Sequence, residues 1–163
     1  MPRTSDASAI PDSSAAFAEW VRPHLAVMAN LAARLASDDE RDDVVQEALL
    51  RSWKKRSQYD LRRGSLRTWL LAITADQARR SRRGARATGF VADLVVPPRS
   101  PDERLDLEDA VSRLAPRQRL AVSCFYFVDL SISETAAVMR CSPGTVKSTL
   151  ADARHRLKEL LDG

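Results

Sequence analysis

Apolar residues recur at intervals of three and four along the first half of the chain, which is the period of one face of an α-helix. The first stripe predicts a helix over about residues 14–36, with Pro23 breaking or kinking it near its start. The second predicts a helix that opens with the acidic run 38–43 and closes with the basic run 54–56, so both ends complement the helix dipole. The third predicts a helix over 65–83 that is capped by Ser65.

The second half of the chain carries the same period in shorter segments. Residues 102–114 predict one helix, and Pro116 begins another that runs to about residue 128. A short helix capped by Ser133 follows, in which Ala136, Ala137 and Val138 suit a tight crossing. Cys141 and Ser142 form a turn, and Ser142 caps a last helix through the backbone N–H of Thr145. The buried stripe of this last helix is Val146, Leu150, Ala153, Leu157 and Leu160.

The helical pattern is interrupted between the two halves. Residues 84–101 contain Pro97, Pro98 and Pro101, which exclude a continuous helix, although the run FVADLVV is apolar for a free linker. We therefore predict an all-α protein with two small helical domains joined by a linker, the second containing a helix-turn-helix. The expected boundaries are a disordered N-terminus over 1–13, domains over 14–83 and 102–163, and the linker over 84–101.

Composition limits the class of protein. The chain has 163 residues, of which 44% are hydrophobic, but no apolar run approaches the length of a membrane span and no signal pattern opens it. These features predict a soluble, cytoplasmic protein without membrane insertion. Cys124 and Cys141 lie without partners at metal-ligand spacing, so we expect reduced thiols and no metal site.

Basic residues are concentrated before the interruption. Residues 1–88 hold 16 Lys and Arg against 11 Asp and Glu, whereas residues 89–163 hold 10 against 11. The highest basic density lies at residues 79–86, in the last turns of the third predicted helix. Such a helix end suits contact with phosphates. Alternatively, these side chains could simply complement the dipole at the helix C-terminus. That role explains two arginines more easily than the five present, which are Arg79, Arg80, Arg82, Arg83 and Arg86.

The last helix has the features of a DNA-recognition helix. Its exposed positions near the N-terminus are short and polar, so a backbone there could approach base edges in a major groove. A capped amphipathic helix pair is also common in helical proteins that bind no DNA. The turn-and-cap sequence SPGTVKS favours the DNA interpretation.

No catalytic constellation is evident. His24 and His155 are the two histidines, and neither lies near a cysteine or a carboxylate pair at ligand spacing. Ser123 and Cys124 have no neighbouring base, and the chain contains no glycine-rich phosphate loop. We therefore expect a protein that is not an enzyme and that uses no cofactor.

Three motifs, of which the last consists of two stretches, occur in an order that resembles bacterial RNA polymerase sigma factors of the extracytoplasmic-function (ECF) group. DDVVQEALLRSW (42–53) resembles the helix that binds the β′ clamp helices of core polymerase, and YDLRRGSLRTWLLAIT (59–74) resembles the segment that opens and reads the minus-ten element. LAPRQRLAV and SETAAVMRCSPGTVKSTLADARHRL resemble the domain that reads the minus-thirty-five element and rests on the β flap. The resemblance covers about residues 14–161.

This resemblance implies three sets of site residues, with core RNA polymerase, duplex and melted promoter DNA, and an anti-sigma factor as partners. The implied core-polymerase-binding residues are Asp42, Asp43, Gln46, Glu47, Leu50, Arg51 and Trp53. The implied minus-ten residues are Tyr59, Arg62, Arg63, Arg67, Asp76, Arg79, Arg80 and Arg83. The implied minus-thirty-five residues are Ser142, Pro143, Gly144, Thr145, Lys147, Ser148, Thr149 and Arg154.

The chain also departs from the family pattern. Leu66, Asp76 and Arg80 stand where members often carry Phe, Asn and Asp, and Thr149 and Asp152 stand where the recognition helix is commonly basic. The promoter sequence therefore cannot be transferred from relatives. Two alternatives use fewer of the motifs: a stand-alone helix-turn-helix regulator, which leaves the segments at 42–53 and 59–83 without a task, and a helical protein-interaction module.

Overall fold

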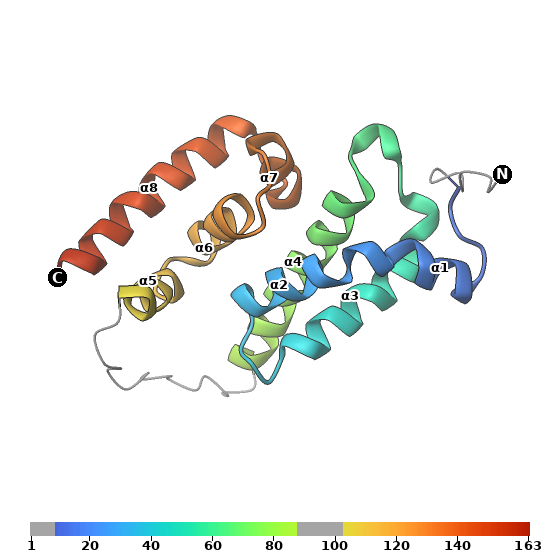
Figure 1. The fold of residues 1–163 in the computed structure, drawn as a ribbon, viewed down its shortest axis with the longest axis horizontal. Coiled ribbons are helices and arrows are strands. Elements are labelled where there is room, and N and C mark those ends of the chain that lie inside the picture. The colour runs from blue at the N-terminus through green and yellow to red at the C-terminus, as the bar shows by residue number, and fades with distance from the viewer. Residues whose placement is uncertain (1–8, 88–102) are drawn as a thin grey trace. The chain divides into compact units, whose positions relative to one another are not determined.

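The computed structural model describes residues 9–87 and 103–163, and in both ranges regular structure is helical, without strands (Figure 1). The elements are α1 (Ser14–Val21), η1 (Arg22–His24), α2 (Leu25–Leu35), α3 (Arg41–Lys55), η2 (Arg56–Gln58), η3 (Leu61–Arg63), α4 (Leu66–Ala87), α5 (Glu103–Ser112), α6 (Pro116–Val122), η4 (Ser123–Phe127), α7 (Ile132–Met139) and α8 (Pro143–Asp162). The predicted all-α class is confirmed. No helix in the described ranges has a stretch long and apolar enough to cross a bilayer.

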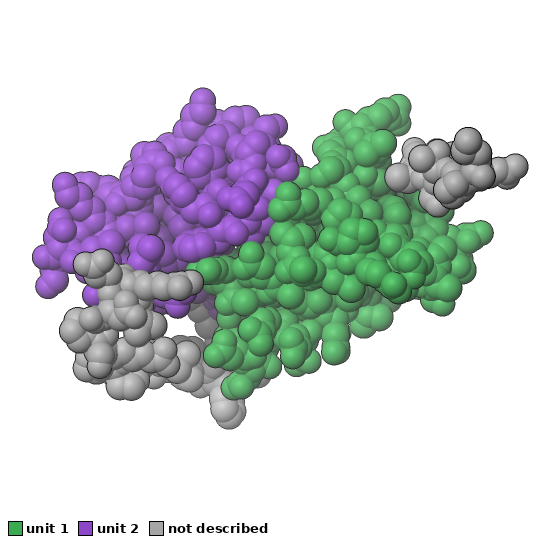
Figure 2. All heavy atoms as spheres, in the orientation of Figure 1, with its two compact units in different colours: residues 1–78 green, residues 79–163 purple. Residues whose placement is uncertain are grey.

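The chain divides into two compact units, Met1–Ala78 and Arg79–Gly163, which Figure 2 shows in green and purple. The division falls inside α4, which is continuous from Leu66 to Ala87. Residues 84–87 of the expected linker are thus helical. The remainder of that segment, including the apolar run FVADLVV, lies outside the described residues.

In the first unit, α2 packs against α3. Met28 and Leu31 of α2 and Ala48 of α3 are fully buried, as are Leu70 and Leu71 of α4. The predicted break at Pro23 is confirmed, because the 3-10 turn η1 separates α1 from α2. The buried hydroxyls of Ser52 and Thr74 do not disturb the helices, because each bonds to the carbonyl four residues earlier: Ser52 Oγ to Ala48 O at 2.7 Å and Thr74 Oγ1 to Leu70 O at 2.8 Å.

In the second unit, α8 packs against α5, α6 and α7 (Figure 1). The core consists of Val111, Leu114, Ala121, Val122, Ala136, Met139, Val146, Leu150 and Ala153. The helix predicted from Pro116 to about residue 128 exists, but its last part, η4, is a π-helix. There the backbone N–H of Val128 bonds to the carbonyl of Ser123 at 3.0 Å, five residues back.

Two details of the helix-turn-helix differ from the sequence-based expectation. The cap of α7 is Ser131, not Ser133: its Oγ accepts from Glu134 N at 3.0 Å, and the Glu134 carboxylate accepts from Ser131 N at 3.4 Å. This reciprocal capping box is more effective than a single hydroxyl. Ala137 is exposed, so the tight crossing is made by Ala136 and Val138. Arg140 ends α7 in the left-handed conformation at φ 55°.

Candidate protein and nucleic-acid interfaces

One face of α3 is exposed and combines acidic, amide and apolar side chains. Asp43, Gln46 and Glu47 are exposed, and Leu50 lies at the centre of the same face with 51% of its surface accessible. The opposite face is buried through Val44, Ala48 and Ser52. Leu50 therefore places a large apolar side chain among carboxylates on this exposed face. Asp42 is also exposed, at the edge of this face.

The other two residues expected on this surface lie at its borders. Arg51 is half-buried. Trp53 is half-buried between Phe17, whose ring centroid is 5.3 Å away, and the Arg56 guanidinium, which lies 3.6 Å from the indole centroid. Arg56 also donates to Trp53 O at 2.7 Å and to Pro11 O at 2.9 Å. Residues 9–13, expected to belong to a disordered terminus, are therefore placed in part by the end of α3, with Pro11 buried.

The loop between α3 and α4 stands on an aromatic cluster formed by Trp20, Tyr59 and Trp69. The Tyr59 ring lies 5.4 Å from Trp20 and 5.4 Å from Trp69, and its hydroxyl donates to Gly64 O at 3.4 Å. Burial, followed by the nearby Asp60 carboxylate, raises the pKa of Tyr59. Tyr59, one of the minus-ten residues that the resemblance implies, is thus half-buried and supports the loop from within.

The tip of this loop is the short helix η3. Asp60 caps it, accepting from Arg62 N at 3.0 Å and pairing with Arg62 Nε at 3.2 Å. Hydrogen bonds from the Arg62 side chain and backbone lower the pKa of the Asp60 carboxyl. Leu61, Arg62 and Arg63 are exposed, Leu61 to 60%. Sequence reasoning missed Leu61, although a lone leucine between charged loop residues was a usable signal.

The charged residues predicted on α4 fall on two different faces. Ser65 caps the helix as expected, accepting from Thr68 N at 3.1 Å. One side of the helix carries Asp76, Arg79, Arg80 and Arg83, which recur at helical spacing. The three arginines are exposed. Arg67 belongs to another side.

Arg67 lies close enough to His24 for its charge to affect the histidine. Burial and then the Arg67 charge lower the pKa of this histidine. The Arg67 guanidinium therefore lies near α2 and η1 in the first unit. The structure does not bring it together with the arginines at the other end of α4.

The N-terminus of α8 presents small polar groups that are fixed by local hydrogen bonds. Ser142 Oγ accepts from Thr145 N at 3.1 Å, which confirms the predicted cap, and lies 2.9 Å from Thr145 Oγ1. Ser148 Oγ donates to Thr145 O at 3.0 Å. Lys147 and Ser148 are exposed and Thr149 is half-buried. These bonds hold the hydroxyl side chains of the first turns of α8 in one arrangement, close to the helix backbone.

Pro143 and Gly144 occupy the first turn of the same helix, and both are exposed. A Cβ added at Gly144 would meet only Ser142 Oγ, at 3.8 Å. The fold therefore does not require glycine at this position. Its effect is to keep the helix end free of side-chain bulk.

Arg154, the last residue expected to contact the upstream element, lies further along α8. Its Nη1 donates to the Tyr126 hydroxyl of η4 at 2.9 Å. Tyr126 is 46% exposed and packs edge-on against Phe125 with centroids 5.0 Å apart. Sequence reasoning gave Tyr126 no role, because the two residues are 28 positions apart.

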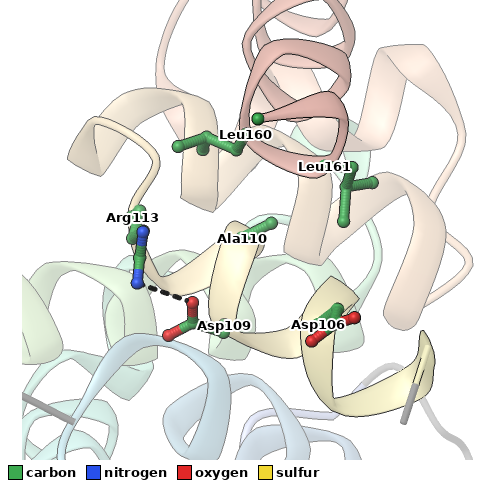
Figure 3. A pocket seen from close by; sticks show the side chains of 7 residues that line it. Asp106, Asp109, Ala110, Arg113, Leu160 and Leu161 are labelled. Carbon is green, nitrogen blue, oxygen red and sulfur yellow. Dashed lines mark ion pairs between the residues drawn. The ribbon is translucent and has the colours of Figure 1, made fainter. Parts of the chain in front are cut away.

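A hollow of about 230 Å³ lies between α5 and the end of α8 (Figure 3). It is lined by Asp106, Asp109, Ala110, Arg113, Leu160, Leu161 and Gly163. Arg113 pairs with Asp109 at 2.9 Å, and Leu161 is 47% exposed. Its lining combines an ion pair with leucine side chains and contains no nucleophile–base pair.

The cysteines and Arg119 have structural surroundings. Cys124 is buried in the second unit, and desolvation raises the pKa of its thiol to about 12, far from the range of a reactive thiolate. Cys141 is half-buried in the turn before α8. Arg119 donates to the carbonyls of Ser112 and Leu114 and thereby caps the end of α5, and burial lowers its pKa.

Comparison with known proteins identifies both halves of the chain. Residues 20–88 match the family described as Sigma-70 region 2, and residues 104–157 match Sigma-70, region 4. The structure resembles that of the sigma factor RpoE from Bartonella quintana, solved in complex with the anti-sigma factor NepR. The TM-score is 0.72 at 25% sequence identity, over 90% of this chain and 96% of the other.

Curated relatives agree with this match along most of the chain. The ECF RNA polymerase sigma factor SigL of Mycobacterium tuberculosis (strain Erdman) is 32% identical over 146 residues, covering 83% of this chain and 82% of the relative. SigK of Mycobacterium ulcerans is 29% identical over 134 residues, covering 74% and 72%. Two sigma regions in the family order, and identity that extends through both, lead to one conclusion: the chain belongs to the ECF RNA polymerase sigma factors, which direct promoter-specific transcription initiation and are not enzymes.

Proposed function

We propose that this ECF sigma factor divides transcription initiation among three surfaces. The exposed face of α3 binds the β′ clamp helices of core polymerase, the loop and the arginine face of α4 hold the melted minus-ten strand, and the start of α8 reads the minus-thirty-five duplex. Sigma factors in general bind core polymerase and promoter DNA. The assignment of these tasks to particular residues is our proposal.

The exposed face of α3 gives the strongest support for this proposal. Leu50, half exposed at its centre, supplies apolar area, and Asp43 and Glu47 supply charges that can pair with basic residues of a partner. The face is rigid, because Val44, Ala48 and Ser52 anchor the opposite side in the core of the first unit. Such a preformed surface loses little conformational entropy on binding.

The loop and α4 suit a single strand better than a duplex. Leu61 and the two arginines of η3 project from an aromatic base that fixes their position. An unstacked base can lie against an apolar side chain while arginines hold its phosphates. In this proposal Tyr59 fixes the loop, and Leu61, which is exposed at its tip, supplies the apolar contact.

The start of α8 suits duplex DNA. Its outer surface holds a glycine, short hydroxyl side chains and one lysine, so the helix can enter a major groove without rearrangement. Thr149 and Asp152 supply no positive charge at this helix. Affinity should therefore depend mainly on residues outside the first turns of α8, while these turns contribute selectivity.

We further propose the domain boundaries 14–83 and 102–163 for these functions, with the second domain resting on the β flap. We also propose an anti-sigma factor as a partner. The support is the similarity to RpoE, which was solved with its anti-sigma factor NepR. A tagged copy of the chain, isolated from its own cells before and after stress, should carry such a protein in one state and polymerase in the other.

The central test is assembly with core polymerase. Asp43→Lys with Glu47→Lys reverses two charges on the α3 face, both exposed, so helical content should not change. The free energy of unfolding should fall by no more than about 1 kcal/mol, because Asp43 lies in the first turn of α3. Binding to core polymerase, measured by native gel shift or fluorescence anisotropy, should weaken at least tenfold, or about 1.4 kcal/mol.

The matched control is Asp12→Lys with Glu19→Lys. It makes the same change of charge at exposed positions of the same unit, outside α3. Its core binding should remain close to that of the wild type. Equal binding by the α3 variant and the control would contradict the assignment of α3, and wild-type protein that does not bind core polymerase would contradict the proposed function as a whole.

A further inference from the structure

The second unit contains an arginine–tyrosine pair whose position the polymerase-binding and base-reading surfaces do not explain. Arg154 of α8 donates to the Tyr126 hydroxyl at 2.9 Å, and both residues are exposed. An exposed arginine ordinarily samples many rotamers. Here a neighbouring element restricts it, at the border of the helix that we propose to read DNA.

The helical geometry of α8 places Arg154 on a defined flank. Val146, Leu150 and Ala153 face the core. At 100° per residue, Lys147, Arg154 and Lys158 lie within about 40° of one another on one side of the exposed surface. Thr145, Thr149 and Arg156 lie on the other side. Seven residues separate Lys147 from Arg154, or about 10 Å along the axis, so Arg154 lies about two turns beyond Lys147 on the same flank of α8.

The π-helical turn η4 explains why Tyr126 reaches this flank. Phe125 and Phe127 are partly buried and pack against the core, whereas Tyr126 between them is exposed. The bond from Val128 N to Ser123 O spans five residues and widens the turn. Such turns often occur at functional positions. The edge-on contact with Phe125, at 5.0 Å, holds the Tyr126 ring in place.

The chemistry of the pair fits a phosphate. The Tyr126 oxygen accepts one N–H of the guanidinium, which leaves four N–H donors and the full positive charge for another acceptor. Arginine binds phosphate oxygens with two parallel hydrogen bonds, and this geometry benefits from a guanidinium that is already oriented.

We propose that Tyr126 is a positioning residue for upstream promoter binding: its hydroxyl orients the Arg154 guanidinium on the flank of α8 to bind a backbone phosphate beside the minus-thirty-five bases. This inference rests on the proposed function of α8. The contact raises affinity on all upstream sequences and does not discriminate between bases, because phosphates carry no sequence information.

The experiment uses full-length protein assembled with core polymerase and a promoter duplex selected by the wild-type holoenzyme from genomic fragments. Equilibrium binding is measured across a potassium chloride series, and ethylation interference identifies the phosphates in contact. Arg154→Ala should weaken binding about tenfold, lower the salt slope by about 0.9 and remove interference at one phosphate next to the upstream element.

Tyr126→Phe removes one oxygen and keeps the ring on Phe125, so thermal stability should be unchanged. It should weaken binding about threefold to tenfold. In the Arg154→Ala background the same change should have no further effect, because the group that it positions is gone. Arg154→Lys should retain the salt slope but lose the dependence on Tyr126, since the bidentate geometry is absent.

The control is Arg156→Ala, which removes the same charge from the opposite flank of the same helix, where Arg156 pairs with Glu159 at 3.0 Å. It should leave the slope and the interference pattern intact. Unchanged binding by Tyr126→Phe, additive losses in the double variant, or equal effects of the two alanine substitutions would each overturn the inference. Wild-type holoenzyme that binds no genomic fragment would overturn the proposed function itself.

Discussion

The arginine face of α4 and the first turns of α8 are two candidate DNA surfaces with opposite side-chain chemistry. The α4 face carries Arg79, Arg80 and Arg83, long side chains with full charge. The α8 surface carries Gly144, Ser148 and the hydroxyls that cap the helix, which are small and neutral. Lys147 is the one basic residue among these first turns.

This difference indicates a division between affinity and selectivity. Flexible cations accommodate a distorted, melted backbone and release counterions, whereas a low, rigid helix surface permits close approach to base edges. Neither surface could replace the other. Substitutions on the arginine face of α4 should therefore affect all promoters, and substitutions in the first turns of α8, before Arg154, should change promoter preference.

The largest effect is expected for Arg79→Ala with Arg80→Ala. The loss of two charged contacts should reduce open-complex formation by about a hundredfold on every promoter, and the salt slope should fall by about 1.4. Transcription by reconstituted holoenzyme across a salt series measures both. Arg22→Ala with Arg113→Ala, which removes two exposed arginines elsewhere, is the control. A double variant that changed only promoter preference would reverse the assignment of the two surfaces.

Substitution at Lys147 or Ser148 should act on preference. Either alanine variant should change discrimination between wild-type and scrambled upstream elements by about tenfold to a hundredfold, the value of one lost base contact at about 1–3 kcal/mol. Competition binding with the two duplexes measures the ratio. Weakening of both duplexes by the same factor would show that these residues contact only the backbone.

The loop tip tests whether apolar contact contributes to melting. Leu61→Ser leaves the core untouched, because Leu61 is 60% exposed, but should reduce open-complex formation about tenfold if a base packs against it. Permanganate footprinting of the melted strand provides the measurement. Leu107→Ser, at another exposed leucine, should have no effect. Rescue of the Leu61 variant on a pre-melted template would place the defect at strand opening.

Gly144→Ala adds one methyl group and should affect DNA recognition without weakening the fold. The added Cβ meets only Ser142 Oγ, so stability should be unchanged or slightly higher, by up to about 1 kcal/mol. Upstream-duplex binding should nevertheless weaken about threefold to tenfold. Gly84→Ala in α4, where a Cβ meets no atom within 4 Å, is the matched control. Equal DNA binding by both variants would show that α8 does not approach the DNA closely at Gly144.

The smallest effect concerns the frame that holds α8. Ser131→Ala should lower the free energy of unfolding by about 1 kcal/mol, because it removes the oxygen that accepts from Glu134 N. Ser133→Ala, two residues away and exposed, should change it by less than about 0.5 kcal/mol. Urea denaturation of the two variants compares them directly. A larger loss of unfolding free energy for Ser133→Ala than for Ser131→Ala would identify Ser133 as the cap, as the sequence had predicted.

The sequence by itself determined the features that depend on neighbouring residues. Helix periods, the break at Pro23 and the caps at Ser65 and Ser142 follow from spacings of one to four positions, and the structure confirms them. The predicted buried stripe of α8 is confirmed at Val146, Leu150 and Ala153, whereas Leu157 and Leu160 are only partly buried. The choice between Ser131 and Ser133 failed even at this range. Ser131 precedes α7, whereas Ser133 is its second residue, and only Ser131 is followed three positions later by a glutamate that completes the capping box.

The tertiary structure decided which side chains the folded chain leaves available. Tyr59 lies among Trp20 and Trp69 because three distant segments bury their rings together, and this burial leaves Leu61 at the loop tip. Tyr126 meets Arg154 across 28 positions because a π-turn and the packing of α8 bring them together. Residue type and local period indicate that aromatic and basic groups are present. Their environment depends on contacts between residues far apart in the chain, which no local pattern encodes.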